Sequence, residues 1–428
     1  MKQSKPYAKA LLKFIEESPS PYHVIANLTE LYQAQGFEAL DEKKTWKMEW
    51  GKSYVITRNG CALIAVRLPK DKKKVKGLHV AAAHCDSPTF KVKENPERQA
   101  GPYVTLNAEP YGGMIHSTWL DRPLSIAGRV AVEEKGEVTS KLVSVDRDLL
   151  VIPNLAIHMN RDVNKGYEYK PQTDLQPLFA IGTEEKGASF LDVIAKAAGV
   201  KPEQILGHDL FLYVRDKGRI FGAQEEFILS PRLDDLQCVY TLAESQASTP
   251  VGEYVSICAI FDNEEVGSGS DQGADSTFFE DVLLRMSEAL SISAGKLREW
   301  IAAGFLISAD NAHAVHPNHP EKADPTNRPV IGGGPVAKFS AAQKYTTDGF
   351  TAAVFRSLCK KADVPSQTFT NHSDVPGGST LGNISTAHVS IPSVDIGLPQ
   401  LAMHSAVETA GVNDAYFLAK VMKEYFSE

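Results

Sequence analysis

The segment at residues 255–268 constrains the fold of this chain more than any other stretch. Residues 255–261 are apolar and partly β-branched, a pattern that predicts a buried strand. This strand leads directly into three carboxylates, those of Asp262, Glu264 and Glu265. Desolvating so much negative charge is costly unless cations or hydrogen-bond donors meet it, so the segment favours a metal site over a solvated acidic loop.

The adjacent residues Glu264 and Glu265 allow two roles within one site. On extended backbone, neighbouring side chains point in different directions. One carboxylate can therefore bind a metal while the other stays free as a proton acceptor. Because glutamate is mostly an exposed residue, this interpretation depends on partners elsewhere in the chain.

Charge and composition exclude several classes of protein. The 428 residues carry a net charge of −8, which argues against a nucleic-acid or anionic-membrane surface. No apolar run approaches the length of a membrane span, and residues 1–18 predict an amphipathic helix and not a signal peptide. The cysteines are odd in number and scattered, which favours a reducing cytoplasm: Cys61, Cys85, Cys238, Cys258 and Cys359.

Two kinds of pattern divide the chain into a discontinuous domain and an insertion. Residues 1–93 and 225–428 alternate helical and strand patterns, which predicts an α/β domain. Residues 94–224 are β-rich. We therefore expect an α/β fold that carries an inserted β-rich domain.

Within the insertion, residues 124–132 and 138–145 alternate in polarity and predict a β-hairpin. Only residues 189–200 predict a helix there, with Ser189 as the N-cap. The insertion also contains His158 in an apolar run, where a lone histidine is more often a structural residue than a site residue.

Two further apolar strands end in side chains that can bind metals. Residues 77–83 predict a buried strand that is followed by His84 and Asp86. At this spacing Asp86 can hold one ring nitrogen of His84 while the other ring nitrogen faces a metal. Residues 305–309 repeat the arrangement and end in Asp310.

Two other candidates lie at predicted helix starts. Asp234 falls in the first turn of a helix predicted to run to about residue 245, where helix capping is the alternative to metal binding. The segment from Ser405 to Glu408 has the pattern of a capping box, which predicts a helix directly after His404. A histidine fixed in this way suits a rigid metal ligand.

Three histidines at intervals of three, His313, His316 and His319, form a possible second metal cluster. Pro317 and Pro320 break any helix that would align the rings, so an exposed loop is the favoured interpretation. The glycine-rich segments lack the ending of a phosphate loop, which disfavours nucleotide binding.

The candidates gain weight as a set, because ligand sites in α/β folds gather at the carboxyl ends of strands. Two imidazoles and three carboxylates can hold two zinc-like ions if one carboxylate bridges them: His84, Asp234, Glu265, Asp310 and His404. Two such cations would lower the pKa of a bridging water, Glu264 would remove its proton, and the hydroxide would attack a polarised carbonyl. The pattern thus predicts metal-assisted amide hydrolysis.

With these motifs the chain resembles the aspartyl aminopeptidase family of dinuclear zinc peptidases, in a bacterial-type form. The resemblance extends over essentially the whole chain and rests on motifs in order: His84-Cys-Asp-Ser-Pro, Pro231-Arg-Leu-Asp234, Asp262-Asn-Glu-Glu-Val-Gly-Ser268, Ser308-Ala-Asp310, Gly334-Pro-Val-Ala-Lys338 and Leu401-Ala-Met-His404-Ser405. It implies an aminopeptidase that removes N-terminal residues from peptides.

The resemblance also implies individual roles. One zinc is held by His84, Asp310 and bridging Asp234, and the other by Asp234, Glu265 and His404. Glu264 is then the general base, Asp86 orients His84, Lys338 meets an acidic substrate side chain, and His158 contributes to an active site of a neighbouring subunit. Cobalt, manganese or iron are alternatives to zinc.

For assembly and substrates, the resemblance implies that the insertion is a dimerisation domain and that dimers form a closed dodecamer admitting peptides. Cys85, Asp235 and Lys344 depart from the family's usual residues, and relatives of this type can be broader, so neutral first residues such as leucine remain an alternative to Asp and Glu. Two other functions remain open: a dinuclear deacylase or carboxypeptidase-type amidohydrolase, and a non-catalytic assembly protein of the same fold.

Overall fold

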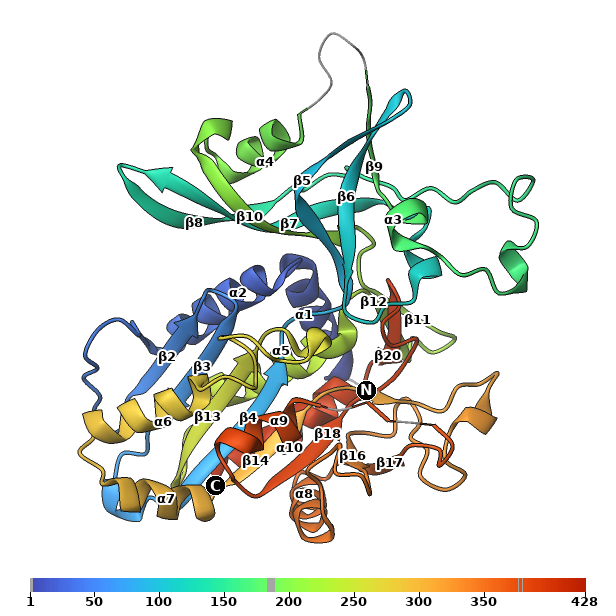
Figure 1. The fold of residues 1–428 in the computed structure, drawn as a ribbon. Coiled ribbons are helices and arrows are strands. Elements are labelled where there is room, and N and C mark those ends of the chain that lie inside the picture. The colour runs from blue at the N-terminus through green and yellow to red at the C-terminus, as the bar shows by residue number, and fades with distance from the viewer. Residues whose placement is uncertain (1–2, 183–188, 376, 379) are drawn as a thin grey trace.

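The computed structural model describes residues 3–182, 189–375, 377–378 and 380–428, whose strands form three sheets (Figure 1). The largest sheet has nine strands in the order β1-β2-β3-β13-β4-β14-β18-β16-β17. Its bounds are β1 Glu38–Leu40, β2 Ser53–Arg58, β3 Ala62–Arg67, β4 Gly77–His84, β13 Tyr254–Phe261, β14 Phe305–Ala309, β16 Val336–Phe339, β17 Gln367–Thr370 and β18 Ser393–Gly397. Four central strands run parallel to one another: β13, β4, β14 and β18. Strand β3 pairs antiparallel with β13, and strand β16 pairs antiparallel with β18, so the sheet is mixed.

Helices cover both faces of this sheet, which explains the continuous apolar runs of its central strands. One face packs on α1 Ser4–Glu17, α2 Pro21–Ala34, α5 Leu233–Ser248, α8 Gly349–Lys361 and α10 Asp414–Ser427. The other packs on α6 Phe278–Ala289, α7 Ala294–Ala302 and α9 Leu381–His388. The layers confirm the predicted α/β fold class.

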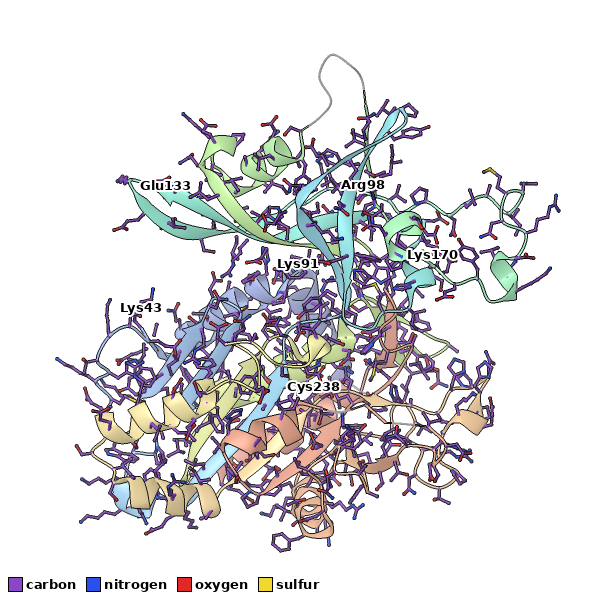
Figure 2. All side chains as sticks on the ribbon, viewed as in Figure 1. Lys43, Lys91, Arg98, Glu133, Lys170 and Cys238 are labelled. Atoms are coloured by element: carbon purple, nitrogen blue, oxygen red, sulfur yellow. The ribbon has the colours of Figure 1, made fainter. Side chains whose placement is uncertain are left out.

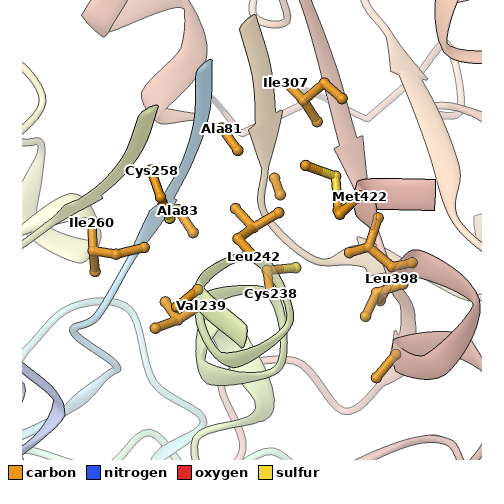
Figure 3. Packing of buried hydrophobic residues seen from close by; sticks show 14 of the residues in the cluster. Ala81, Ala83, Cys238, Val239, Leu242, Cys258, Ile260, Ile307, Leu398 and Met422 are labelled. Carbon is orange, nitrogen blue, oxygen red and sulfur yellow. The ribbon is translucent and has the colours of Figure 1, made fainter. Parts of the chain in front are cut away.

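Successive residues of a central strand serve opposite layers. On β4, Ala81 and Ala83 pack with α5 and α10, as seen with Leu242 and Met422 in Figure 3. Val80 belongs to the opposite cluster, which includes α6 and α7. Small side chains on β4 let the helices approach the sheet closely, and the dense packing holds the strand ends in place.

The second sheet lies above the first in Figure 1 and is antiparallel. Its order is β8-β7-β10-β5-β6-β9, with β5 Thr89–Ala100, β6 Tyr103–Tyr111, β7 Leu124–Glu134, β8 Glu137–Ser144, β9 Leu178–Ile181 and β10 Ile205–Val214. It has its own apolar core with Phe90, Ile126 and Phe190. All six strands fall within residues 89–214, while the exact domain limits stay a prediction.

The hairpin and the helix predicted for this region are confirmed. The hairpin β7–β8 turns between Glu134 and Glu137. Helix α4 Phe190–Ala198 has Ser189 as its N-cap, whose hydroxyl accepts a hydrogen bond from the amide of Asp192. A short helix, α3 Pro171–Asp174, was not predicted.

A third sheet has the order β11-β12-β20-β19-β15 and corrects one prediction. Its strands are β11 Arg219–Phe221, β12 Phe227–Ser230, β15 Ala312–His313, β19 Pro399–Leu401 and β20 Glu408–Gly411. The helix predicted to open at Ser405 is wrong, because β20 begins at Glu408 and pairs with β12. The Glu408 carboxylate accepts hydrogen bonds from the amide of the distant Asp234 and from that of the nearby His404, so these donors replace the helix cap.

The side chains follow the same inside–outside division. Cys238, on helix α5, is buried in the large domain, whereas Lys43 and Glu133 lie at the periphery in Figure 2. All five cysteines are buried and free. In the part of the chain that the structure describes, no helix has both the length and the apolarity needed to cross a bilayer.

His79 on β4 makes a testable contribution to stability. Its ring stacks between Tyr254 and Tyr425 at centroid distances of 3.7 and 4.2 Å, and its Nδ1–H donates to the Tyr425 carbonyl at 2.8 Å. Burial lowers the pKa of His79 to about 4, from an ordinary value of 6.5. As the pH falls, His79 is therefore protonated in the unfolded chain before it is protonated in the folded one. Its contribution to the free energy of unfolding is present above pH 6.5 and is lost as the pH falls from 6.5 to about 4.

We expect wild type to lose about 2 kcal/mol of unfolding free energy relative to His79→Phe when the pH falls from about 7 to 5. Phenylalanine keeps the stacking but does not titrate. Urea unfolding of both proteins at the two pH values measures the difference. A difference that does not change with pH would contradict a neutral, buried His79.

Candidate metal centre

Parallel pairing brings the predicted site residues to one edge of the large sheet. Strand β4 pairs with β13, where His84 lies opposite Phe261, and with β14, where Ala82 lies opposite Ser308. The carboxyl ends of the three strands therefore meet at the same edge. His84 ends β4, the short 3₁₀ turn Glu264–Val266 follows β13, and Asp310 follows β14.

The remaining two candidates reach this edge from other elements. Asp234 lies in the first turn of α5, and His404 lies in the loop between β19 and β20. His404 has a φ of 66°, a left-handed conformation that the surrounding hydrogen bonds hold. The edge therefore combines strand ends, a helix start and a loop.

Among the described residues, the potential ligand atoms form three groups within 4.8 Å: His84 with Asp234 and Asp310, Asp234 with Glu265 and His404, and His84 with Glu264 and Glu265. The Nε2 atom of His84 lies 3.7 Å from Asp234 Oδ1 and 3.9 Å from Asp310 Oδ1. The Nε2 atom of His404 lies 3.4 Å from Asp234 Oδ2 and 3.4 Å from Glu265 Oε2. The two oxygens of Asp234 thus face two different groups.

The chemistry of the cluster fits divalent cations. Asp234 Oδ1 and Glu265 Oε1 are buried and have no hydrogen-bond partner among the described residues. Burial and the charge of Asp234 raise the pKa of Glu265 well above its ordinary value. Such oxygens are costly to keep unless a cation meets them, and a set of carboxylates and imidazoles suits zinc.

The neighbouring carboxylates raise the pKa values of the two imidazoles in the cluster, His84 and His404. Burial alone would lower the pKa of His404, but its hydrogen bond to Asp234 and the charge of Glu265 raise it to about 10. For His84, burial is likewise outweighed by Asp310 and Asp86, and its pKa is raised. The site therefore attracts positive charge at both ends.

Asp86 connects the two sides of the cluster. The Nδ1–H of His84 donates to the Asp86 carbonyl at 3.1 Å, and Asp86 Oδ1 lies 3.3 Å from the same nitrogen. This fixes Nε2 toward the cluster. The Asp86 carboxylate also accepts hydrogen bonds from the amides of Glu264 and Glu265, both at 3.1 Å. It thereby fixes the turn that carries both glutamates.

The second sheet supplies contacts that the sequence analysis missed. The hydroxyl of Tyr111, at the end of β6, donates to Asp86 Oδ2 at 2.7 Å. The carbonyl of Gly113 accepts from His404 Nδ1 at 2.7 Å, which leaves His404 Nε2 facing the carboxylates. No local pattern links residues 111–113 to the site.

Glu408 is a further missed residue. Its fully buried carboxylate accepts from the amide of Asp234 at 3.0 Å and from the amide of His404 at 2.7 Å. One side chain thus holds the backbone of two candidate ligands from different parts of the chain. The capping-box pattern from Ser405 to Glu408 correctly predicted that Glu408 accepts hydrogen bonds. It predicted a donor at the start of a helix, whereas the observed donors are the amides of Asp234 and His404.

Glu264 and Asp262 have different surroundings. Glu264 lines the pocket at the cluster, and burial, outweighing the attraction of His84, raises its pKa to about 7. Asp262 is buried beside Asn263, accepts its amide at 2.9 Å, and belongs to none of the three groups. The first of the three strand-end carboxylates is therefore outside the cluster.

The cluster lies in a pocket of about 320 Å³. Lys338 from β16 contributes to its lining, and its buried ammonium donates to the Asp310 carbonyl at 2.8 Å, to Asp310 Oδ2 at 3.3 Å and to the Asn311 carbonyl at 3.3 Å. Lys338 thus holds Asp310, and its predicted contact with substrate stays a prediction.

Of the other predicted histidines, His313 lines the metal pocket, while His158, His316 and His319 lie elsewhere. His158 is exposed in the segment between β8 and β9 and is not among the described residues that line the pocket. His316 and His319 line a neighbouring pocket and belong to none of the three potential ligand groups found in the described ranges. Within the described part of the chain, these histidines do not form a separate metal cluster.

A mixed sheet with two overlapping imidazole–carboxylate groups at its carboxyl edge defines the class of metal-dependent α/β hydrolases. The comparisons are more specific. The family described as "Aminopeptidase I zinc metalloprotease (M18)" matches residues 14–426, so the chain belongs to the M18 family of zinc aminopeptidases.

Individual relatives agree with this assignment. A "Probable M18 family aminopeptidase 2" of Clostridium novyi is 44% identical over 434 residues, covering 100% of both chains. The solved structure described as "Cryo-EM structure of the Ape4 and Nbr1 complex" has a TM-score of 0.96 at 36% identity, covering 99% of this chain and 86% of that one. For "Structure of S. cerevesiae mApe1 dodecamer" the TM-score is 0.85 at 28% identity, with 99% and 96% covered. The predicted family, fold and aminopeptidase function are confirmed.

Proposed function

We propose that this M18 aminopeptidase removes acidic, or more broadly chosen, first residues from peptides at a centre of two divalent ions. The observation that supports the two-ion centre is Asp234, whose two oxygens face separate groups of potential ligands. A carboxylate in this position can bridge two cations, which a single-ion site would not need.

In this proposal His84, Asp234 and Asp310 hold one ion, and Asp234, Glu265 and His404 hold the other. When bound, zinc ions lower the pKa of water and polarise the carbonyl that is attacked. Cobalt, manganese and iron are the alternatives that metal analysis would identify. Asp86, Glu408 and Gly113 keep the ligands oriented through the hydrogen bonds described above.

Glu264 acts as the general base. Its carboxylate lines the pocket beside the proposed ligands, where it can accept a proton from the attacking water. The same carboxyl group can then deliver the proton to the departing amine. Glu264 is adjacent to Glu265 and is fixed by the amide contact with Asp86 Oδ1.

Lys338 is proposed to favour acidic first residues by placing a buried positive charge in the pocket. The contacts with Asp310 give it a second effect, since they position a ligand. A preference for neutral residues would assign Lys338 to this positioning role alone.

We further propose that the chain self-associates through its insertion. Three large apolar side chains are exposed beside His158: Leu155 at 54%, Ile157 at 48% and Met159 at 70%. A second copy of the chain would cover them and receive His158 at its site. The likeness to the mApe1 dodecamer supports a dodecamer. The five free cysteines support a cytoplasmic location.

Hydrolysis of a panel of free-amine amino-acid amides, from Asp and Glu to Leu and Lys, tests the proposed activity after metal content has been determined. We expect two metals per chain and cleavage of the Asp and Glu amides, with N-acetylated versions resistant because the site must receive a free amine. Cleavage of only blocked substrates would indicate a deacylase or carboxypeptidase. No cleavage of either set with two metals bound would support a non-catalytic assembly protein.

A further inference from the structure

A second pocket of about 310 Å³ adjoins the metal pocket and has the opposite charge. Its titratable lining residues are Lys322, Arg328, His313, His316, His319 and His372. None of the described lining residues is a carboxylate, whereas the metal pocket is lined by Asp234, Glu264, Glu265 and Asp310. We call this second pocket the cationic pocket.

The two pockets share walls. His313 and Phe369 line both of them. The segment from β19 continues the wall, because Gln400, Leu401 and Ala402 line the cationic pocket while the next two residues, Met403 and His404, line the metal pocket. A ligand held at the metal centre can therefore extend directly into the cationic pocket.

The permanent charges of the cationic pocket are available to a ligand. Arg328 is exposed, and no described residue forms a hydrogen bond or ion pair with its guanidinium. The ammonium of Lys322 likewise has no ion-pair partner within 4 Å in the described ranges. Two of the histidines, by contrast, already have a carboxylate beside them. The Nδ1 atom of His319 lies 3.3 Å from Glu321 Oε1, and the Nδ1 atom of His372 lies 3.8 Å from Asp374 Oδ2. Arg328 and Lys322 are therefore the groups best placed to bind an anion.

We propose that the cationic pocket binds the C-terminal carboxylate of short peptides, with Arg328 as the main contact. This inference rests on the proposed aminopeptidase function and names its preferred substrates. A free peptide carries an ammonium at one end, which the acidic metal pocket attracts, and a carboxylate at the other. Each residue spans about 3.3–3.6 Å, so the carboxylate of a short peptide held at the metal pocket lies within a few residues of the adjoining pocket.

Charge and geometry favour this occupant over two others. The histidines do not form a potential metal-binding group among the described residues, which argues against a cation. An acidic side chain of the first residue is the second alternative, but Lys338 already supplies a buried cation at the metal pocket itself. A guanidinium can bind a carboxylate with two parallel hydrogen bonds, which suits a terminal carboxylate.

The test compares matched peptides that differ only at their C-terminus. The first residue is the one whose amide wild type cleaves fastest, followed by one alanine with a free carboxylate or a carboxamide. We expect wild type to prefer the free acid about tenfold in kcat/KM, mainly through KM, since a charge-assisted hydrogen bond is lost in the amide. Arg328→Gln should reduce this acid-to-amide ratio to near one, and Lys322→Gln should reduce it partly.

Arg147→Gln is the matched control, since Arg147 is an exposed arginine in the insertion and is absent from the described lining of both pockets. It should keep the wild-type ratio. Equal cleavage of acid and amide by wild type would overturn the proposal, as would an unchanged ratio in both pocket variants. A change in the preference for Asp over Leu as first residue, with the ratio intact, would instead assign the pocket to the first side chain. If no free-amine substrate were cleaved, the proposed function itself would fail.

Discussion

Replacing Glu264 with glutamine is expected to lower kcat by a factor of about 10²–10⁴ while both metals stay bound. Glutamine has nearly the same shape as glutamate but cannot accept the proton of the attacking water. The proposed ligands are unchanged, and the backbone N–H of residue 264 can still donate to Asp86 Oδ1. Steady-state kinetics and metal analysis on the same preparation measure the two effects separately.

Glu288→Gln is a suitable control for this variant, because Glu288 is an exposed glutamate on α6. It should retain wild-type kcat and metal content. If Glu264→Gln instead lost one metal, Glu264 would be a ligand, as its group with His84 and Glu265 allows. Retained activity with two metals would assign the base to another residue.

Asp234→Asn is expected to lose most of both metals and to reduce activity by at least about a thousandfold. Asp234 is shared by the groups around His84 and around His404, so its loss weakens both proposed sites. An amide oxygen carries no charge to offset the two cations. Metal content after desalting, together with activity, provides the measurement.

His404→Gln provides the comparison, because His404 belongs to only one of the ligand groups. We expect this variant to keep one metal, held by His84, Asp310 and Asp234. Thermal unfolding after chelation is the control for misfolding: metal-free Asp234→Asn should have a Tm no lower than that of metal-free wild type, because the buried carboxylate is costly without a cation. Equal metal loss in both variants would contradict a bridging role for Asp234.

Much of the fold and the proposed ligand set could be predicted because the relevant signals are local. The apolar runs before His84 and Asp310, and the run before Glu264, each predict a buried strand that ends in a polar side chain. Parallel strands in an α/β fold place such ends together, so their proximity was predictable without knowing the strand order. The hairpin β7–β8 was predictable for the same reason, since its alternation and turn are contiguous in sequence.

Other parts depended on contacts between distant segments. Glu408 has the local pattern of a helix cap, yet its carboxylate accepts from Asp234 and His404 because β20 pairs with β12 beside them. Tyr111 reaches Asp86 only because the second sheet packs over the strand ends. The cationic pocket likewise forms from segments that meet in space, including Arg328 and His372.

The sequence by itself determined the strand and helix periods, the class of fold and the residue types that can hold cations, because these follow from neighbouring residues along the chain. Only the tertiary structure decided which acceptor each buried donor finds and how charge is divided between adjoining pockets. The physical reason is that a buried polar group must be paired, and its partner is set by packing of the whole molecule. Lys338 illustrates the difference: the family resemblance implies a substrate contact that stays a prediction, while the tertiary structure pairs its buried ammonium with Asp310.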